Sequence, residues 1–214
     1  MISKRIKELA KLVPLKKRII DVGCDHALLD IYMAENHENI SFLATDISAN
    51  AIKGAIKNIK ESNLEHRIKT LVTNGLDGIS LEKDDAIVIS GMGTNTIIKI
   101  VSPYLDKIND IVIQTNRDIE LLREFMFKNG FKVKDEKIVY DDRYYTFIYF
   151  EKGESKLSDV DIWLGPIIKG SNNKDYFEFL LKKYKKILVG IPTNDSKKND
   201  VQNRVDILTS LIQK

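Results

Sequence analysis

The chain has 214 residues, of which 43% are hydrophobic and 30% are charged. This composition excludes a disordered chain and provides enough apolar residues for one or two globular domains. No apolar run approaches the roughly 20 residues of a membrane-spanning helix, and residues 2–11 lack the apolar core of a signal peptide. We therefore expect a cytoplasmic protein with no membrane partner. We also expect a monomer.

Cysteine content and charge distribution restrict the chemistry further. The single cysteine, Cys24, excludes an internal disulfide and lacks the companions of a structural zinc site, so no metal is expected. The net charge is +3, yet seven basic residues stand against one acidic residue, Glu8, in residues 3–18. This cluster is either a solvated helix face or a surface that binds phosphates. Its members are Lys4, Arg5, Lys7, Lys11, Lys16, Lys17 and Arg18.

The first 130 residues alternate between helical and strand patterns. Apolar residues recur at helical spacing from Ile2 to Val13 and predict an amphipathic helix that Pro14 ends. The alternation that follows predicts an α/β fold with a parallel sheet covered on both faces. The predicted strands are residues 18–22, 40–45, 67–73, 86–89 and 110–114. The predicted helices are residues 27–35, 50–61, 96–104 and 119–129, the last closed by Gly130 in a left-handed cap.

The pattern changes after Gly130. Residues 131–140 and 144–150 are two β-rich runs separated by three polar residues, which predicts a hairpin. An antiparallel pair at the end of a parallel sheet is typical of Rossmann-like methyltransferases. This inference rests on fold analogy.

The last part of the chain is different in character. Residues 151–159 are polar and predict a linker. Apolar residues at steps of three and four in 177–188 and 201–211 predict a helical hairpin that needs a packing partner to be stable. We expect a cofactor-binding domain over residues 1–150, followed by a linker and a small helical domain over residues 151–214.

A candidate cofactor loop follows the first predicted strand. Gly23 allows a sharp turn and a close approach of the backbone to a ligand, and the next helix begins just beyond it. Asp46 ends the second strand, at the position where a carboxylate accepts hydrogen bonds from both ribose hydroxyls of an adenosine. The alternative role for Asp46 is a cap for the helix after Ser48. The joint occurrence of Gly23 and Asp46 favours the ribose role.

Charge in this loop distinguishes between adenosine cofactors. A dinucleotide would place its pyrophosphate where Asp25 stands, and two negative groups about 4 Å apart would repel by about 4 kcal/mol at an effective dielectric constant near 20. S-adenosylmethionine carries a sulfonium and an ammonium instead, which Asp21 and Asp25 would attract. No phosphate-binding Gly-x-x-x-x-Gly-Lys-Ser/Thr loop occurs in the sequence. We therefore predict S-adenosylmethionine as the cofactor.

A second glycine-containing loop, Ser90-Gly-Met-Gly-Thr-Asn95, follows the fourth predicted strand. It stands at the carboxyl edge of the sheet, where open α/β folds bind ligands. Glycines on both sides of Met92 would let the main chain approach a planar base or the transferred methyl group. The alternative is a tight strand-to-helix turn capped by Thr94 or Asn95. The Asn/Asp-Pro-Pro-aromatic tetrad of enzymes that methylate exocyclic amines is missing, which favours a ring nitrogen as acceptor.

Several motifs in sequence order resemble the bacterial tRNA (adenine-22-N1)-methyltransferases, and the resemblance extends over nearly the whole chain. It implies a Rossmann-like domain followed by a helical, coiled-coil-like domain. It also implies that methyl transfer occurs to N1 of an adenine in tRNA. The motifs are residues 21–27, 44–48, 74–76, 91–93, 113–116, 121–124, 129–131 and 164–166.

The resemblance implies cofactor roles for particular residues. Asp21, Gly23, Asp25 and His26 would line the methionine end of the cofactor, and Asp46 with Ile47 the ribose. Asn74 and Gly75 would flank the adenine, and Gly91, Met92 and Gly93 would face the transferred methyl group.

Four positions depart from the family's usual pattern. Thr94 stands where a second glycine is usual and Thr115 where a proline is usual, while Leu28 and Asp30 replace an aromatic residue and a proline. These departures concern the shape of the acceptor pocket more than cofactor binding.

The predicted reaction needs little acid–base chemistry. N1 of adenine has a free lone pair, so alignment of the reacting groups can supply most of the catalysis, and no general base is predicted. His26 is more typical of a hydrogen-bonding fixture than of a base, and Cys24 has no covalent step to perform.

N1 lies on the Watson–Crick edge, so the target base must be unpaired or extruded. We predict that Asn116 holds it by hydrogen bonding and Tyr145 by stacking, although Tyr145 could equally be a packing residue. Lysines and an arginine would bind tRNA phosphates, unless they are ordinary solvated residues. These are Lys4, Arg5, Lys7, Lys182, Lys183, Lys185 and Lys186.

Other functions remain open at the level of sequence. The chain could methylate a small molecule or a protein, or it could bind RNA without catalysis through a vestigial cofactor fold. A nicotinamide oxidoreductase is disfavoured by Asp25.

Overall fold

The computed structural model describes residues 2–192 and 194–213. The chain forms two compact units, one extending to Pro166 and one beginning at Ile167. None of the described helices is long and apolar enough to cross a membrane.

The first unit is built on one seven-stranded sheet in the order β3-β2-β1-β4-β5-β7-β6. Strands β3, β2, β1, β4 and β5 pair in parallel, and β7 pairs antiparallel with both β5 and β6. The prediction of a parallel sheet that ends in an antiparallel hairpin is therefore confirmed. The strands are β1 (Arg18–Val22), β2 (Ser41–Asp46), β3 (Ile68–Val72), β4 (Asp85–Met92), β5 (Asp110–Thr115), β6 (Phe131–Tyr140) and β7 (Tyr144–Lys152).

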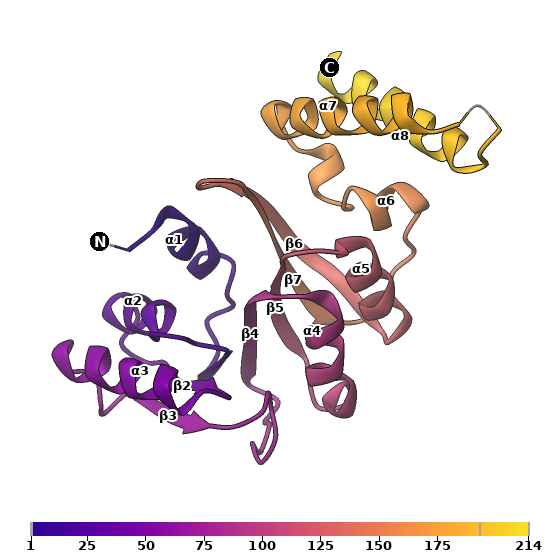
Figure 1. Ribbon diagram of the computed structural model, residues 1–214. Helices are drawn as coiled ribbons and strands as arrows, with labels where there is room; N and C mark the ends of the chain where they lie inside the picture. Colours follow the sequence, from indigo (N-terminus) through magenta and orange to yellow (C-terminus); the bar gives the residue numbers. More distant parts are fainter. Residues whose placement is uncertain (1, 193, 214) are drawn as a thin grey trace. The chain divides into compact units, whose positions relative to one another are not determined.

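Helices cover both faces of the sheet (Figure 1). The helices α1, α2 and α3 lie on one side of the central strands, and α4 and α5 lie on the other. Their bounds are α1 (Lys4–Ala10), α2 (Leu28–Asn36), α3 (Ala49–Glu61), α4 (Thr94–Val101) and α5 (Ile119–Lys128).

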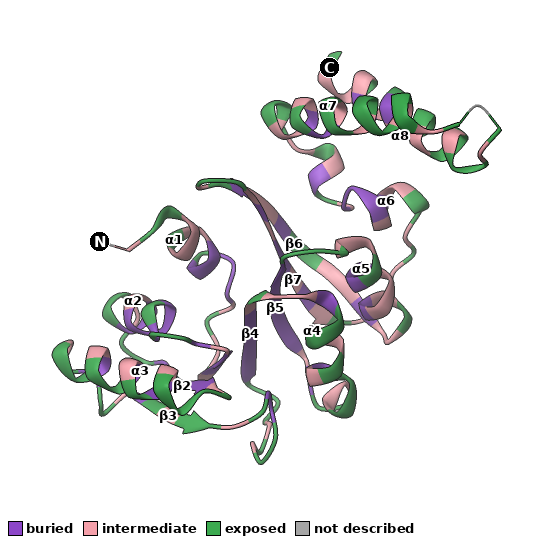
Figure 2. Ribbon diagram, in the orientation of Figure 1, coloured by how far each residue is buried: buried purple, intermediate pink, exposed green. Residues whose placement is uncertain are grey.

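Alternation along the central strands divides the core into two apolar clusters. Ile19 packs on the α1–α3 side and Ile20 on the α4–α5 side, and Val88 and Ile89 divide in the same way. Successive side chains of a strand point to opposite faces, so a strand buried on both faces must be apolar at nearly every position. Figure 2 shows β4 and β5 as buried over most of their length. Because these strands pack tightly in the core, their carboxyl ends are held in place at one edge of the sheet.

Two element boundaries differ from the predictions for local reasons. The helix predicted over 96–104 is α4 followed by a 3-10 turn at Ser102–Tyr104, where Pro103 interrupts the α-helical pattern. The predicted linker contains a short helix, α6 (Asp159–Trp163), which begins with a capping box between Ser158 and Asp161. The Ser-x-x-Asp spacing was the available sequence signal for this helix.

Residues 151–166 belong to the first unit, so the division between the units lies at Pro166 rather than near Phe150. The Arg123 guanidinium of α5 donates hydrogen bonds to the carbonyls of Ile162 and Trp163, each at 3.1 Å. It also pairs with Glu136 of β6 at 3.1 Å, and both side chains are almost wholly buried. Gly165 passes this pair so closely that a Cβ there would lie 2.1 Å from Glu136 Oε2. Two motifs of the sequence, 121–124 and 164–166, therefore meet at one buried ion pair.

The second unit contains a helix pair, α7 (Lys174–Gly190) and α8 (Lys197–Gln213). Phe177 and Leu180 of α7 and Val205 and Leu208 of α8 are buried. Arg204 of α8 donates a 2.9 Å hydrogen bond to the hydroxyl of Tyr184 on α7. The predicted helical hairpin is confirmed.

Candidate functional site

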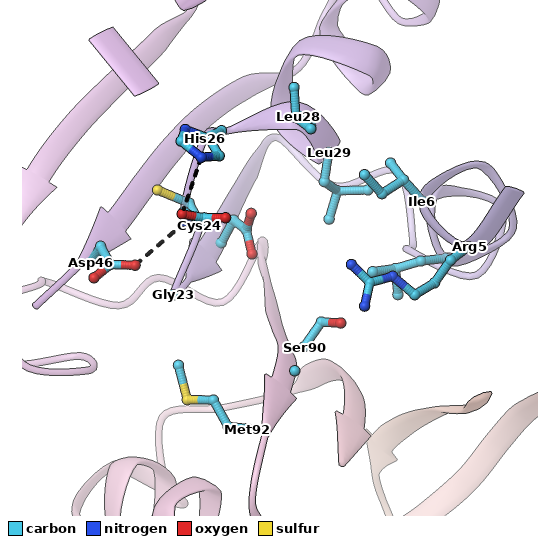
Figure 3. Close-up of a pocket in the computed structure, with 14 residues that line it drawn as sticks. Arg5, Ile6, Gly23, Cys24, His26, Leu28, Leu29, Asp46, Ser90 and Met92 are labelled. Atoms are coloured by element: carbon cyan, nitrogen blue, oxygen red, sulfur yellow. Dashed lines mark hydrogen bonds and ion pairs between the residues drawn. The ribbon is translucent and has the colours of Figure 1, made fainter. Parts of the chain in front are cut away.

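A pocket of about 380 Å³ lies at the carboxyl ends of β1, β2 and β4 (Figure 3). It brings together seven of the predicted cofactor residues from three separate segments. These are Asp21, Gly23, Asp25, His26, Asp46, Gly91 and Met92. Parallel strands place their carboxyl ends at one edge of a sheet, which explains why residues distant in sequence converge here.

Gly23 is required by the geometry of the loop after β1. Its φ of +78° lies in the left-handed region, and a Cβ at this position would lie 2.3 Å from Cε of Met92. Asp25 and Ala27 also have positive φ values, of 51° and 55°. The loop is therefore a tight turn held against the β4 loop, which agrees with the role predicted for Gly23.

Three backbone amides of the loop after β1 have partners at the end of β2. The N–H groups of Gly23 and Cys24 both donate to the carbonyl of Thr45, at 2.8 and 2.9 Å. The Asp25 N–H donates to Oδ2 of Asp46 at 3.4 Å. The carboxylates of Asp25 and Asp46 line the pocket beside this turn, and their negative charge disfavours the pyrophosphate of a nicotinamide cofactor. Carboxylates around the pocket fit a cationic ligand instead.

Asp46 extends from the tip of β2 and is not the cap of α3. Ser48 caps that helix, because its hydroxyl accepts from the Ala51 N–H at 3.3 Å. The Asp46 carboxylate accepts from the Ser48 N–H at 2.8 Å and from the Asp25 N–H. A carboxylate has about four acceptor positions, so capacity remains for two ribose hydroxyls.

A pair of buried carboxyls supports the floor of the pocket. Asp21 is 6% exposed and Asp30 of α2 is wholly buried. Neither oxygen of Asp30 has a donor in hydrogen-bonding geometry among the described residues, and the side chain that it meets is Asp21. Burial, followed by the charge of Asp21, raises the pKa of Asp30 well above its ordinary value. Burial raises the pKa of Asp21 to about 7. We conclude that protonated Asp30 donates to the Asp21 carboxylate.

This pair predicts a pH dependence of stability. Unfolded carboxyls lose their protons near pH 4, whereas folded Asp21 keeps its proton to about pH 7 and the pKa of Asp30 is also well above its ordinary value. The free energy of unfolding should therefore fall as pH rises from 4 to 7, by up to about 1.4 kcal/mol per pH unit for each of the two carboxyls. Asp30→Asn keeps a hydrogen-bond donor and removes one titrating group, so its pH slope should be flatter in urea unfolding. Asp84→Asn, at an exposed carboxylate, is the control, and equal slopes for wild type and Asp30→Asn would contradict the shared proton.

Cys24 and His26 behave as structural groups of the loop. Burial and the nearby carboxylates raise the pKa of the Cys24 thiol far above neutrality, so it is no nucleophile. His26 packs over Gly54 of α3, where a Cβ would lie 2.9 Å from its Nδ1. Its Nε2 lies 3.6 Å from Asp25 Oδ1, and its carbonyl accepts from Asn58 at 3.0 Å.

Two departures from the family pattern lie in contact beside the β4 loop. The hydroxyls of Thr94 and Thr115 are 2.9 Å apart and both residues are buried. Thr94 also donates to the carbonyl of Arg117 at 2.7 Å, while Thr115 is within hydrogen-bonding distance of the Met92 carbonyl at 3.2 Å. The two hydroxyls therefore connect the β4 and β5 ends, where the family usually has a glycine and a proline.

The residues predicted to hold the acceptor base are engaged within the protein. Asn116 donates to the Gly91 carbonyl at 2.6 Å, and its Oδ1 accepts from Gln114 and Arg143. Tyr145 is 6% exposed and does not line the pocket. Four predicted cofactor residues also lie outside the lining: Ile47, Asn74, Gly75 and Gly93.

The basic cluster of residues 3–18 separates into two groups. Lys11, Lys16, Lys17 and Arg18 form ion pairs within the first unit, with Glu8, Asp110, Asp84 and Asp85. No ion pair of Lys4, Arg5 or Lys7 occurs in the described part of the chain. In the second unit, Lys182, Lys183, Lys185 and Lys186 are all exposed on α7.

Sequence reasoning missed most of the apolar lining and the position of Arg5. Arg5 extends from α1 into the pocket, in the direction of Ser90 (Figure 3). The contact of α1 with the turn between β6 and β7 that places Arg5 there is distant in sequence, so no local pattern indicates it. The other unpredicted lining residues are Ile6, Leu9, Cys24, Leu28, Leu29 and Ser90. Among the described residues, no cluster of three or more His, Cys, Asp or Glu side chains could hold a metal ion.

Comparison with known proteins places this site in a family. The family model for the methyltransferase domain matches residues 2–148. A protein of Mycoplasma genitalium described as a putative tRNA methyltransferase is 32% identical over 191 residues, 85% of this chain and 87% of that protein. The Bacillus subtilis tRNA (adenine(22)-N(1))-methyltransferase is 29% identical over 157 residues, 72% of this chain and 66% of that protein. The chain belongs to the tRNA (adenine-22-N1)-methyltransferase family.

A solved structure supports this family assignment over the full length. M. capricolum TrmK, in complex with the cofactor product S-adenosyl-homocysteine, is 30% identical and superimposes with a TM-score of 0.83. The match covers 100% of this chain and 98% of that one. The helical second unit is therefore a shared feature of these methyltransferases.

Proposed function

We propose that this chain transfers the methyl group of S-adenosylmethionine to N1 of adenine 22 in tRNA. The observation that carries the proposal is the pocket at the strand ends. It has acidic side chains on the β1 and β2 tips and the Gly91–Met92 backbone facing them. The carboxylates disfavour a pyrophosphate and suit a donor that carries positive charge.

The proposed roles of the residues follow from their positions. Asp46 would accept hydrogen bonds from the ribose, and Asp21 with Asp25 would attract the cationic methionine end. Ile47 would lie at the ribose with Asp46, and Asn74 and Gly75 would flank the adenine. Gly91, Met92 and Gly93 would face the transferred methyl group.

The chemistry requires no proton transfer before attack. When bound, S-adenosylmethionine supplies a methyl group whose carbon–nitrogen bond to N1 forms as the carbon–sulfur bond breaks, with that electron pair remaining on sulfur. The chain's own contribution is alignment of the two substrates, in a pocket that the loop after β1 lines together with the apolar side chains of Ile6 and Leu29. The positively charged product base would be favoured by the acidic pocket residues.

The second unit is proposed to bind tRNA. The exposed Lys182, Lys183, Lys185 and Lys186 of α7 would contact phosphates, together with Lys4, Arg5 and Lys7 of α1. A cytoplasmic location suits a tRNA substrate. The monomeric state remains a prediction.

The test is methyl transfer from labelled S-adenosylmethionine to an unmodified tRNA transcript, with the modified base mapped by nuclease digestion and mass spectrometry. We expect one methyl group per tRNA, at N1 of adenine 22. The matched control is the same transcript with guanine at position 22, which should accept none. Equal labelling of both transcripts would refute the proposed site. Binding of tRNA without labelling would favour a non-catalytic RNA-binding protein, and transfer only to small molecules or proteins would favour the other alternative.

A further inference from the structure

The start of α1 is joined to the turn between β6 and β7 beside the pocket. The backbone N–H of Arg5 donates to Oδ2 of Asp141 at 3.1 Å, although the two residues are 136 positions apart. On the same turn, Oδ1 of Asp142 accepts from the Tyr145 hydroxyl at 2.8 Å. These contacts fix the position of Arg5 relative to the turn.

Two arginines lie over the same aromatic ring. The guanidinium carbon of Arg5 is 5.1 Å from the centroid of the Tyr145 ring, and that of Arg143 is 4.9 Å away. Guanidinium groups at this distance are held by the electrostatic attraction of the ring face. Because Tyr145 is 6% exposed, its ring is poorly placed to stack on an incoming base. Its observed contacts are those of a platform for the two arginines.

Both arginines reach the acceptor side of the pocket. Arg5 lines the pocket itself. Arg143 Nη2 donates to Asn116 Oδ1 at 3.3 Å, and Asn116 Nδ2 donates to the carbonyl of Gly91, a pocket residue, at 2.6 Å. The two positive charges thus flank the loop after β4, where the acceptor base is expected.

Neither guanidinium is held by a carboxylate in an ion pair in the described part of the chain. No ion pair of Arg5 or Arg143 occurs there, and the adjacent carboxylates accept an N–H from Arg5 and the hydroxyl of Tyr145. Each guanidinium has five N–H donors in a planar fork that matches a phosphate. Two guanidinium groups without an ion-pair partner therefore suit a bidentate phosphate ligand.

We propose that Arg5 and Arg143, both positioned on the Tyr145 ring, bind a backbone phosphate next to the acceptor adenosine, and that Tyr145 does not touch the base. This proposal rests on the proposed tRNA methylation. Arg143 is exposed and so can meet RNA directly. Asn116 acts as the link that orients Arg143 relative to the Gly91 loop.

The experiment measures tRNA binding as a function of salt for the full chain with S-adenosyl-homocysteine bound. Arg143→Gln should weaken tRNA binding roughly 10- to 100-fold. It should also reduce the slope of log affinity against log salt, by less than the decrease of about 0.7 to 0.9 that the double variant Arg5→Gln/Arg143→Gln should show on losing the whole phosphate contact. Arg5→Gln should do the same, and Tyr145→Leu should weaken tRNA binding without any change of charge. Lys128→Gln, at an exposed lysine on α5, is the matched control and should leave the slope unchanged.

A measurement of cofactor affinity distinguishes between two anions that the arginines could bind, an RNA phosphate and the carboxylate of the cofactor. We expect unchanged affinity for S-adenosyl-homocysteine in Arg143→Gln, whose side chain does not line the pocket, and this also shows that the variant is folded. An unchanged salt slope in both arginine variants would overturn the proposal. So would a loss of S-adenosyl-homocysteine affinity in Arg5→Gln with tRNA binding intact. If wild type itself neither bound nor methylated tRNA, the proposed function would fail instead, so the two failures are distinguishable.

Discussion

Asp46→Asn should weaken the binding of S-adenosylmethionine by about 100-fold, measured by titration calorimetry. The Asp46 carboxylate at the tip of β2 lines the pocket and has free acceptor positions for two ribose hydroxyls. A hydrogen bond to a charged group contributes about 1.5–3 kcal/mol. The loss of charge in two such bonds would therefore cost about 3 kcal/mol, which is roughly 100-fold in affinity.

The fold should survive this substitution, because an asparagine oxygen can still accept from the Ser48 N–H. Asp84→Asn makes the same chemical change at an exposed residue that pairs with Lys17 at the opposite edge of the sheet, and it should bind the cofactor as wild type does. Unchanged affinity in Asp46→Asn would remove the ribose role from Asp46.

Gly165→Ala should lower the free energy of unfolding by about 3–5 kcal/mol, the range for breaking a buried ion pair. Gly165 has φ of +110°, and a Cβ there would lie 2.1 Å from Glu136 Oε2 and 2.8 Å from Arg123 Nη2. The alanine would have to displace both members of a pair that has almost no contact with solvent. It would also separate Arg123 from the carbonyls of α6 that it binds.

Tryptophan fluorescence provides a local measurement of this effect. The single tryptophan, Trp163, is buried in α6. In urea, its signal in Gly165→Ala should change at a lower denaturant concentration than the circular dichroism of the whole chain. Gly170→Ala is the control, because a Cβ there meets nothing within 4 Å, and its stability should change by less than about 0.5 kcal/mol. If the fluorescence and circular dichroism transitions of Gly165→Ala coincided with each other and with those of wild type, the ion pair would not hold this segment.

The sequence predicted the fold correctly where the local pattern of apolar residues matched the burial of the helix or strand. The strand predicted over residues 18–22 coincides with β1, and the hairpin of β6 and β7 lies where two β-rich runs indicated it. Continuous apolar runs are the signature of strands buried on both faces, and here they had no competing interpretation. The family resemblance, since confirmed, supplied the expectation of a helical second part.

The unpredicted features depend on contacts between distant residues. Arg5 was expected on a phosphate-binding helix face, and only its bond to Asp141 and its position over Tyr145 bring it beside the pocket. Asp30 was noted only as a departure from the family pattern, and its burial against Asp21 depends on the packing of α2 on the sheet. Arg123 and Gly165 were recognisable as motif residues, but their contact crosses about 40 positions. Sequence periodicity carries no information on such pairings.

The most direct test of the account is a crystal structure of this chain soaked with S-adenosyl-homocysteine. We predict that the ligand occupies the pocket with its ribose hydroxyls on the Asp46 carboxylate and its sulfur facing the Gly91–Met92 backbone. A pocket that stays empty at saturating ligand, or an adenosine bound with its ribose away from Asp46, would contradict the assignment of this site to methyl transfer.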